Sequence, residues 1–210
     1  FAVYTYYSDK ETRKIADMVT ENGWDKLGDE VAKITAVESY VKNKYSYNED
    51  LDSDEGNSLS GVIKNKIGGT IGTIRLYSAI FQNLGINFQF VLTGNRDKFI
   101  IDKAFENWNN CDNPLIYFPS EGKFIAPTRP DYREPWILPS WGGTNGLFCK
   151  RTTLGTNNDL EERLMAMLYR HQVEFAVGHG VSVHAEVTKE SSDRALSIET
   201  IIVPTYEVPR

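Results

Sequence analysis

Histidine is missing from the first 150 residues of this 210-residue chain, because its three histidines all lie after residue 170. Imidazole is the side chain that most often accepts a proton in catalysis near neutral pH. Residues 1–150 therefore cannot hold a cysteine–histidine catalytic centre by themselves.

Cysteine is also scarce, since the chain has only Cys111 and Cys149. Two cysteines are too few for a disulfide framework or for a zinc site made of cysteines. The sequence leaves open whether they pair with each other or stay as thiols.

Long apolar runs and an excess of positive charge are missing as well. No run approaches the roughly 20 apolar residues that cross a bilayer, and Phe1–Tyr4 does not open an export signal. The net charge of −6 argues against a phosphate-binding surface over the whole protein. Because the chain lacks an initial Met and stops at Arg210 after a strand-like run, we expect a fragment of a longer protein, whose export signal could have been lost.

Helical spacing of apolar residues dominates the first third of the chain. Between Asp9 and Tyr47 this spacing, seen for example in Ile34 and Val41, predicts helices that Gly23 and Gly28 separate. A further helix is predicted after a glycine turn, because apolar residues at helical spacing run from Ile74 to Leu84 and Gly85 then stops the pattern. Thr70 stands where the N-cap of that helix is expected.

After Gly85 the pattern changes to short strands separated by turns. The predicted strands are Ile86–Thr93, Lys98–Ile101, Leu115–Phe118 and Lys123–Pro127. Helices followed by a small antiparallel sheet indicate the α+β class.

The composition shifts near residues 151–158, which we interpret as a linker between a domain of residues 1–150 and a small α+β segment of residues 159–210. Asn158 and Glu161 form a capping-box pattern at the start of a predicted helix. Val181–Val187 and Leu196–Val203 then alternate as the strands of a hairpin, joined by a polar turn.

The acidic run Asn48–Asn57 raises the question of calcium. An EF-hand loop that begins at Asp50 needs Gly at its sixth position and Glu at its twelfth, and the chain has Glu55 and Gly61 there. We therefore expect a solvated loop, with no metal and no other cofactor.

Residues 1–150 resemble the transglutaminase-like superfamily, which has a papain-like fold, and in particular its bacterial envelope members. The resemblance lies in the order of these segments: Lys66–Thr73, Gln82–Ile86, Leu115–Pro119, Lys123–Thr128, Trp136–Pro139 and Gly143–Leu147. It implies helices packed on a small antiparallel sheet, a ligand groove and a periplasmic or envelope location.

The same resemblance places three catalytic roles on residues that cannot perform them. The cysteine nucleophile at the helix start falls on Thr70, the histidine base at about Pro114 and the orienting aspartate on Ala126. A threonine hydroxyl needs an adjacent base, proline accepts no proton, and alanine orients nothing. The resemblance therefore implies a catalytically degenerate domain, with Thr70 as an ordinary N-cap.

The two cysteines are the candidates for a replacement nucleophile. Cys111 lies in a turn-rich run where we expect an exposed thiol without a base or a helix terminus to activate it, and Cys149 has the surroundings of a core residue. A hydrolase or acyltransferase that uses Cys111 with a tail histidine stays as an alternative.

The tail has its own faint resemblance, to the leading part of helicase-like subunits of bacterial anti-phage defence systems. It rests on Leu168–Gly180 and Val203–Pro209, without a phosphate-binding loop, and it implies a cytoplasmic docking segment for which nucleic acid stays open as a partner. The spacing of His171, His179 and His184 matches no metal motif, so we favour structural roles for them.

The leading hypothesis is a non-catalytic domain for binding or scaffolding, with a protein, peptide or glycan as ligand. Trp108, Trp136 and Trp141 could contact such a ligand or belong to the core. For residues 1–150 the acidic charge argues against nucleic acid.

Overall fold

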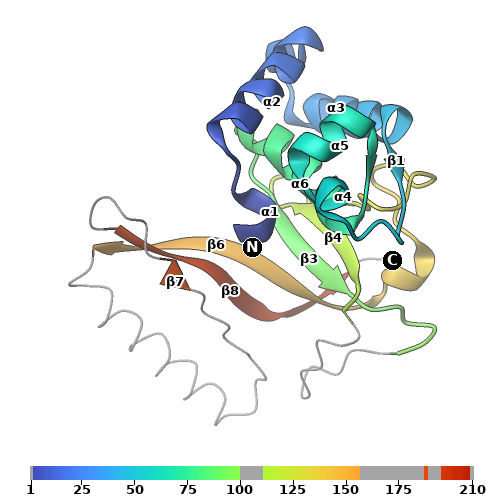
Figure 1. Ribbon diagram of the computed structural model, residues 1–210. Helices are drawn as coiled ribbons and strands as arrows, with labels where there is room; N and C mark the ends of the chain where they lie inside the picture. Colours follow the sequence, from blue (N-terminus) through green and yellow to red (C-terminus); the bar gives the residue numbers. More distant parts are fainter. Residues whose placement is uncertain (1, 100–110, 157–186, 189–194, 209–210) are drawn as a thin grey trace. The chain divides into compact units, whose positions relative to one another are not determined.

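The computed structural model describes residues 2–99, 111–156, 187–188 and 195–208 (Figure 1). The chain divides into two compact units, which we call the helical unit, residues 2–88 and 115–138, and the strand unit, residues 89–114 and 139–210. Within the described part of the chain, no helix combines the length and the apolar character needed to cross a membrane.

The helical unit contains every described α-helix. In chain order its elements are α1 (Ala2–Thr5), α2 (Asp9–Glu21), the 3-10 helix η1 (Trp24–Lys26), α3 (Glu30–Lys44), β1 (Ser46–Tyr47), α4 (Asp54–Asn57), α5 (Leu59–Asn65), β2 (Ile67–Gly68) and α6 (Thr70–Asn83). The greater part of β4 (Asn113–Phe118), from Leu115 on, and all of β5 (Lys123–Ile125) also belong to this unit, and the two strands pair antiparallel. The other α-helices of this unit all contact α6, so α6 is its centre (Figure 1).

Helix α6 is apolar around most of its circumference, which suits a helix that others surround. Leu76, Ile80 and Phe81 are fully buried, and Phe81 meets the ring of Phe118 edge to face at 5.1 Å between centroids. The helix ends at Asn83 with Leu84 as its C-cap, and Gly85 follows with φ +67°, as the sequence predicted.

Helix α3 confirms the predicted amphipathic segment. Asp29 accepts a hydrogen bond from the Ala32 amide at its start, and Ile34 and Val41 are buried on one face. Gly23, at φ +68°, separates α2 from η1, so the predicted break before this helix is also confirmed.

Helix α2 begins with a capping box. The Ser8 hydroxyl accepts from the Glu11 amide, and the Ser8 amide donates to the Glu11 carboxylate at 3.0 Å. The other carboxylate oxygen of Glu11 accepts from the Ser60 amide at 3.2 Å, which ties α2 to α5. One side chain therefore caps its own helix and anchors another.

Replacing Glu11 with Gln is expected to lower the free energy of unfolding by about 0.5–1 kcal/mol at neutral pH, since the partly exposed carboxylate loses its charge. Burial alone would raise the pKa of Glu11, but hydrogen bonds from Ser8 and Ser60 outweigh burial and hold the pKa below its ordinary value. The stabilisation is therefore present above the unfolded-state pKa and is lost as the pH falls through the folded-state pKa.

Urea unfolding at pH 7 and below about pH 4 measures this effect. The difference between the native chain and Glu11→Gln should shrink at the lower pH, whereas Glu21→Gln at the exposed end of the same helix should change little at either pH. An equal difference at both pH values would contradict the assignment.

The strand unit is an antiparallel sheet. Its described elements are β3 (Gln89–Thr93), the 3-10 helix η3 (Pro139–Trp141), β6 (Thr144–Thr156), β7 (Val187–Thr188) and β8 (Ala195–Val208). Strand β6 pairs with β3 on one side and β8 on the other, and β7 pairs with β8. Figure 1 shows β6 and β8 running side by side.

The predicted α+β class is confirmed, and two local predictions are wrong. Lys98 and Phe99, predicted to begin a strand, lie in a turn because both amides donate to the carbonyl of Asn95. Residues 151–156, predicted as the start of a linker, are the end of β6, since the distant strand β8 provides their pairing partner. The rest of the proposed domain division stays a prediction.

The predicted tail is described only in part. Val187 and Thr188 pair antiparallel with Ile198 and Ser197, which agrees with the predicted hairpin. The capping box at Asn158, the tail helix and all three histidines lie outside the described residues.

Candidate functional site

The start of α6 is positioned by the turn before it. Lys66 ends α5 with φ +57°, and the chain then enters β2, which pairs parallel with β1. The Ser46 amide donates to the Lys66 carbonyl at 2.8 Å, and the Asn48 amide donates to the Gly68 carbonyl at 3.0 Å. This pairing brings Tyr47 of β1 next to the first turn of α6.

Glycines allow the backbone of α4 to lie directly against the first turn of α6. The Gly69 amide donates to the Gly56 carbonyl at 3.0 Å. A Cβ atom on Gly69 would lie 2.2 Å from the carbonyl oxygen of Leu51, and one on Gly72 would lie 2.0 Å from that of Gly56. The acidic run was predicted as a solvated loop, and its side chains from Asp52 to Glu55 are indeed exposed. The end of the run, however, forms α4, whose backbone holds the start of α6 in place.

Thr70 is the first residue of α6, and Gly69 is the N-cap. The prediction that Thr70 itself is the N-cap is wrong, because Gly69 has the extended backbone of a cap residue, with φ −75° and ψ −174°, and Thr70 is already helical. Its Oγ1 lies 3.0 Å from the hydroxyl oxygen of Tyr47, and the side chain is half-buried. The N-terminus of a helix stabilises negative charge, but a phenol hydroxyl is neither the imidazole nor the carboxylate that would activate a threonine.

Tyr47 also lines a small pocket of the helical unit. The pocket is bounded by residues of α3, α5 and α6 and by the segment after β5: Val41, Lys42, Tyr45, Ser46, Tyr47, Val62, Thr73, Leu76, Pro127 and Pro130. Burial raises the pKa of Tyr45 to about 12, so its hydroxyl stays protonated. The pocket therefore combines apolar walls with hydroxyl groups and one lysine.

The other two positions with an expected catalytic role carry apolar side chains. Ala126 is fully buried directly after β5, beside the buried Ile125. Pro114 is buried in β4. Neither side chain has an atom that accepts a proton or a hydrogen bond.

Cys111 is buried and only 6% exposed, so the expectation of an exposed thiol is wrong. It forms a buried cluster with Leu147, against which Leu92 packs, and these apolar neighbours exclude water. Burial, followed by the charge of Asp112 and the proximity of Cys149, raises the pKa of Cys111 to about 11. The reactive thiolate form is therefore scarce at neutral pH.

Cys149 is buried as well, as predicted for a core residue, and burial raises its pKa. Both cysteines are thiols in the structure.

The three tryptophans proposed for a groove have different positions. Trp136 is 73% exposed, whereas Trp141 is 2% exposed and belongs to the core of the strand unit, where its carbonyl accepts from the Thr93 hydroxyl at 3.2 Å. Trp108 lies outside the described residues. Among the described candidates, Trp136 has the accessible ring.

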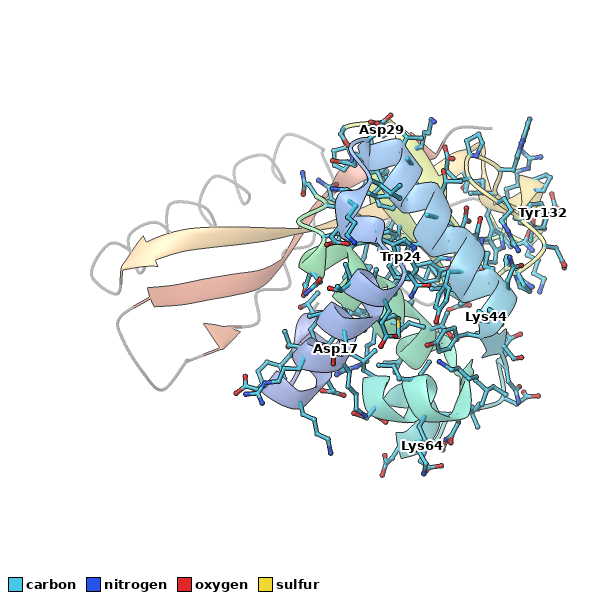
Figure 2. All side chains as sticks on the ribbon, turned by 90° about the horizontal axis from the view of Figure 1, so that it is seen from above. Asp17, Trp24, Asp29, Lys44, Lys64 and Tyr132 are labelled. Carbon is cyan, nitrogen blue, oxygen red and sulfur yellow. The ribbon has the colours of Figure 1, made fainter. Side chains whose placement is uncertain are left out.

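A buried ion pair fixes the segment that carries Trp136. Lys42 Nζ lies 2.6 Å from Glu38 Oε1, and both side chains are 2% exposed. The other carboxylate oxygen of Glu38 accepts from the Glu134 amide at 2.8 Å, and Lys42 also donates to the Tyr132 carbonyl. Tyr132 accordingly lies beside the end of α3 (Figure 2).

Further contacts hold the same segment. Glu134 forms an ion pair with Lys123 at 2.9 Å, Arg133 donates to Asn43 Oδ1 at 3.3 Å, and the Trp136 amide donates to the Arg133 carbonyl at 2.7 Å. The exposed ring of Trp136 is thus attached to a fixed backbone.

Our sequence interpretation missed the network centred on Glu38 and the role of Tyr47. One signal was present: Glu38 follows Ile34 by four residues and precedes Val41 by three, which puts a carboxylate on the apolar face of the helix, with Lys42 four residues later. Tyr47 gave no such signal, because its partner is set by the pairing of β1 with β2.

Metal ligands do not gather in the described part of the chain: no three His, Cys, Asp or Glu side chains there could jointly hold an ion. The tail histidines lie outside those residues, so their proposed structural roles stay predictions.

A buried central helix that the other helices surround, accompanied by the antiparallel pair β4–β5, defines this as an α+β domain. The profile of the transglutaminase-like superfamily matches residues 13–126, more than half of the chain, and the chain belongs to that superfamily. Thr70, Pro114 and Ala126 all lie within the matched residues. No curated protein and no solved structure gives a significant match.

Proposed function

We propose that this chain is a non-catalytic transglutaminase-like domain that binds a protein, peptide or glycan. The observation that carries the proposal is the environment of Thr70, the residue that stands at the start of the central helix. Its hydroxyl is paired with the phenol of Tyr47 at 3.0 Å, and residues 1–150 contain no histidine. A threonine without a base is a poor nucleophile.

The environment of Cys111 argues against the alternative of an active cysteine enzyme. A buried thiol with a raised pKa is neither ionised nor accessible to a substrate. The proposed docking role of the tail in a defence or nucleic-acid-handling complex has no support from the described residues.

Trp136 supports the binding role. Tryptophan is enriched among residues that dominate binding energy, and a ring on a fixed backbone loses little conformational entropy when a ligand covers it. The contacts of Glu38, Lys42 and Arg133 supply that fixed backbone.

Catalysis is tested with glutamine-containing peptides, by following ammonia release, amine incorporation and peptide cleavage. We expect the native chain and Thr70→Ala to be equally inactive. Turnover that disappears in Thr70→Ala would overturn the non-catalytic assignment, and turnover that disappears in Cys111→Ala would favour the alternative enzyme.

Binding is tested by screening peptide and glycan arrays with the native chain and then measuring the affinity of any ligand found. Trp136→Ala is expected to weaken binding by about tenfold or more. Tyr6→Ala is the matched control, because Tyr6 is a 75% exposed aromatic residue elsewhere in the helical unit. Equal affinities for the native chain and Trp136→Ala would remove this residue from the proposed site.

A further inference from the structure

The two cysteines of the chain lie in the same unit. Cys149 is in β6, opposite Phe90 of β3, and Cys111 lies in an irregular segment just before β4. Both side chains are buried thiols, 6% and 9% exposed. They are the whole cysteine content of the protein, so neither has another intrachain pairing partner available.

Packing places Cys111 over the face of β6 that carries Cys149. Cys111 and Leu147 form one buried cluster, and Leu92, which is opposite Leu147 in the β3–β6 register, packs against this cluster. Side chains two residues apart on a strand lie on the same side of the sheet. Leu147 and Cys149 therefore share the face that Cys111 covers, and their pairing with β3 has no register shift, although the pairing of β6 with β8 shifts between Gly146 and Phe148.

The electrostatics agree with this proximity. Burial and the charge of Asp112 make the largest contributions to the raised pKa of Cys111, and Cys149 adds to them. Such an influence acts between groups that are close together.

We propose that Cys111 and Cys149 form an intrachain disulfide when the chain folds in the presence of a small-molecule disulfide such as oxidised glutathione. A disulfide needs Cα atoms roughly 4.4–6.8 Å apart. Cys111 lies outside any strand, so it can adjust to this requirement without losing a ladder pair.

The disulfide forms in two thiol–disulfide exchange steps. One cysteine thiolate attacks a sulfur of oxidised glutathione, which forms a mixed disulfide and releases one glutathione. The second cysteine thiolate then attacks the protein sulfur of the mixed disulfide, which forms the intrachain bond and releases the other glutathione. Two protein thiols are oxidised, the glutathione disulfide is reduced, and the two thiol protons end on the released glutathione.

The burial of the pair decides when this reaction occurs. Both thiols are covered in the folded chain and have raised pKa values, so the reaction is slow there and fast during folding. Once formed, the bond is equally shielded from reductants. It closes a loop of about 40 residues and constrains the unfolded chain, which makes the stability of the strand unit depend on the redox conditions of folding.

The test is to refold the full chain from its reduced, denatured form in a buffer of oxidised and reduced glutathione, and in parallel with reductant alone. Alkylation of remaining thiols followed by peptide mapping identifies the bond. We expect a linked pair of peptides that contain Cys111 and Cys149, and a melting temperature higher by roughly 5–10 °C than that of the reduced chain.

Cys111→Ala and Cys149→Ala are the controls, because neither variant can form the bond and both keep a small apolar side chain. Their melting temperatures should be the same after oxidative and reductive refolding, whatever each substitution costs in itself. Full alkylation of both cysteines in the oxidatively refolded native chain would overturn the proposal, as would disulfides found only between chains.

Discussion

Replacing Lys42 with Met is expected to lower the free energy of unfolding by about 3–5 kcal/mol, which is the cost of leaving a buried charge without its partner. Glu38 is buried, and Lys42 is the cation on its carboxylate at 2.6 Å. Burial lowers the pKa of Lys42, and the charge of Glu38 offsets part of that effect. Chemical denaturation of the native chain and the variant measures the loss.

Two controls separate the loss of the ion pair from a general effect of losing a lysine. Lys44→Met, at the exposed end of the same helix, should change the stability by less than about 0.5 kcal/mol. Combining Lys42→Met with Glu38→Gln should recover part of the stability, because no charge is then buried alone while an amide oxygen still accepts from Glu134. If the double variant lost as much stability as the two single variants lost together, the two charges would not be coupled. That result would contradict the ion pair.

Replacing Gly72 with Ala is expected to lower the free energy of unfolding by about 3 kcal/mol or more, because the added methyl group meets backbone rather than a movable side chain. The new Cβ would lie 2.0 Å from the carbonyl oxygen of Gly56, so α4 and α6 would have to separate. That carbonyl also accepts from the Gly69 amide, which the same movement would disturb. Thermal unfolding and denaturant titration both measure the effect.

Gly28→Ala is the matched control for Gly72→Ala. No atom lies within 4 Å of a Cβ placed on Gly28, which also has no positive φ. We expect this variant to be as stable as the native chain or slightly more stable, because alanine restricts the unfolded chain. If Gly72→Ala changed the free energy of unfolding as little as Gly28→Ala does, α4 and α6 could move apart at little cost. That result would contradict the prediction.

Much of the helical unit could be predicted because its signals are local. The spacing of Ile34 and Val41, the break at Gly23 and the stop at Gly85 act over one or two helical turns, and the structure confirms each. The strand predicted from Leu115 to Phe118 is also confirmed, and its signal, a short apolar run between turn residues, is local as well. Lys98 and Phe99 were misassigned because their alternation matched a strand while Asn95 organised a turn.

The site was less predictable, because its contacts join residues far apart in the chain. Tyr47 reaches Thr70 through the pairing of β1 with β2, and Glu38 reaches Glu134 across 96 residues. Cys111 is covered by Leu147 and Leu92, which its turn-rich neighbours did not suggest. None of these partners can be inferred from periodicity or from turn residues.

The sequence by itself determined the absence of histidine from residues 1–150, the helical character of the segments up to Leu84 and the membership of the transglutaminase-like superfamily. These properties depend on residue identity and on short-range order. The tertiary structure decided which partner Thr70 has, that Cys111 is buried over β6, and that Lys42 neutralises Glu38 beside the segment of Trp136. Burial and pairing arise only when distant segments pack together, and the same threonine or cysteine has a different reactivity in each such environment.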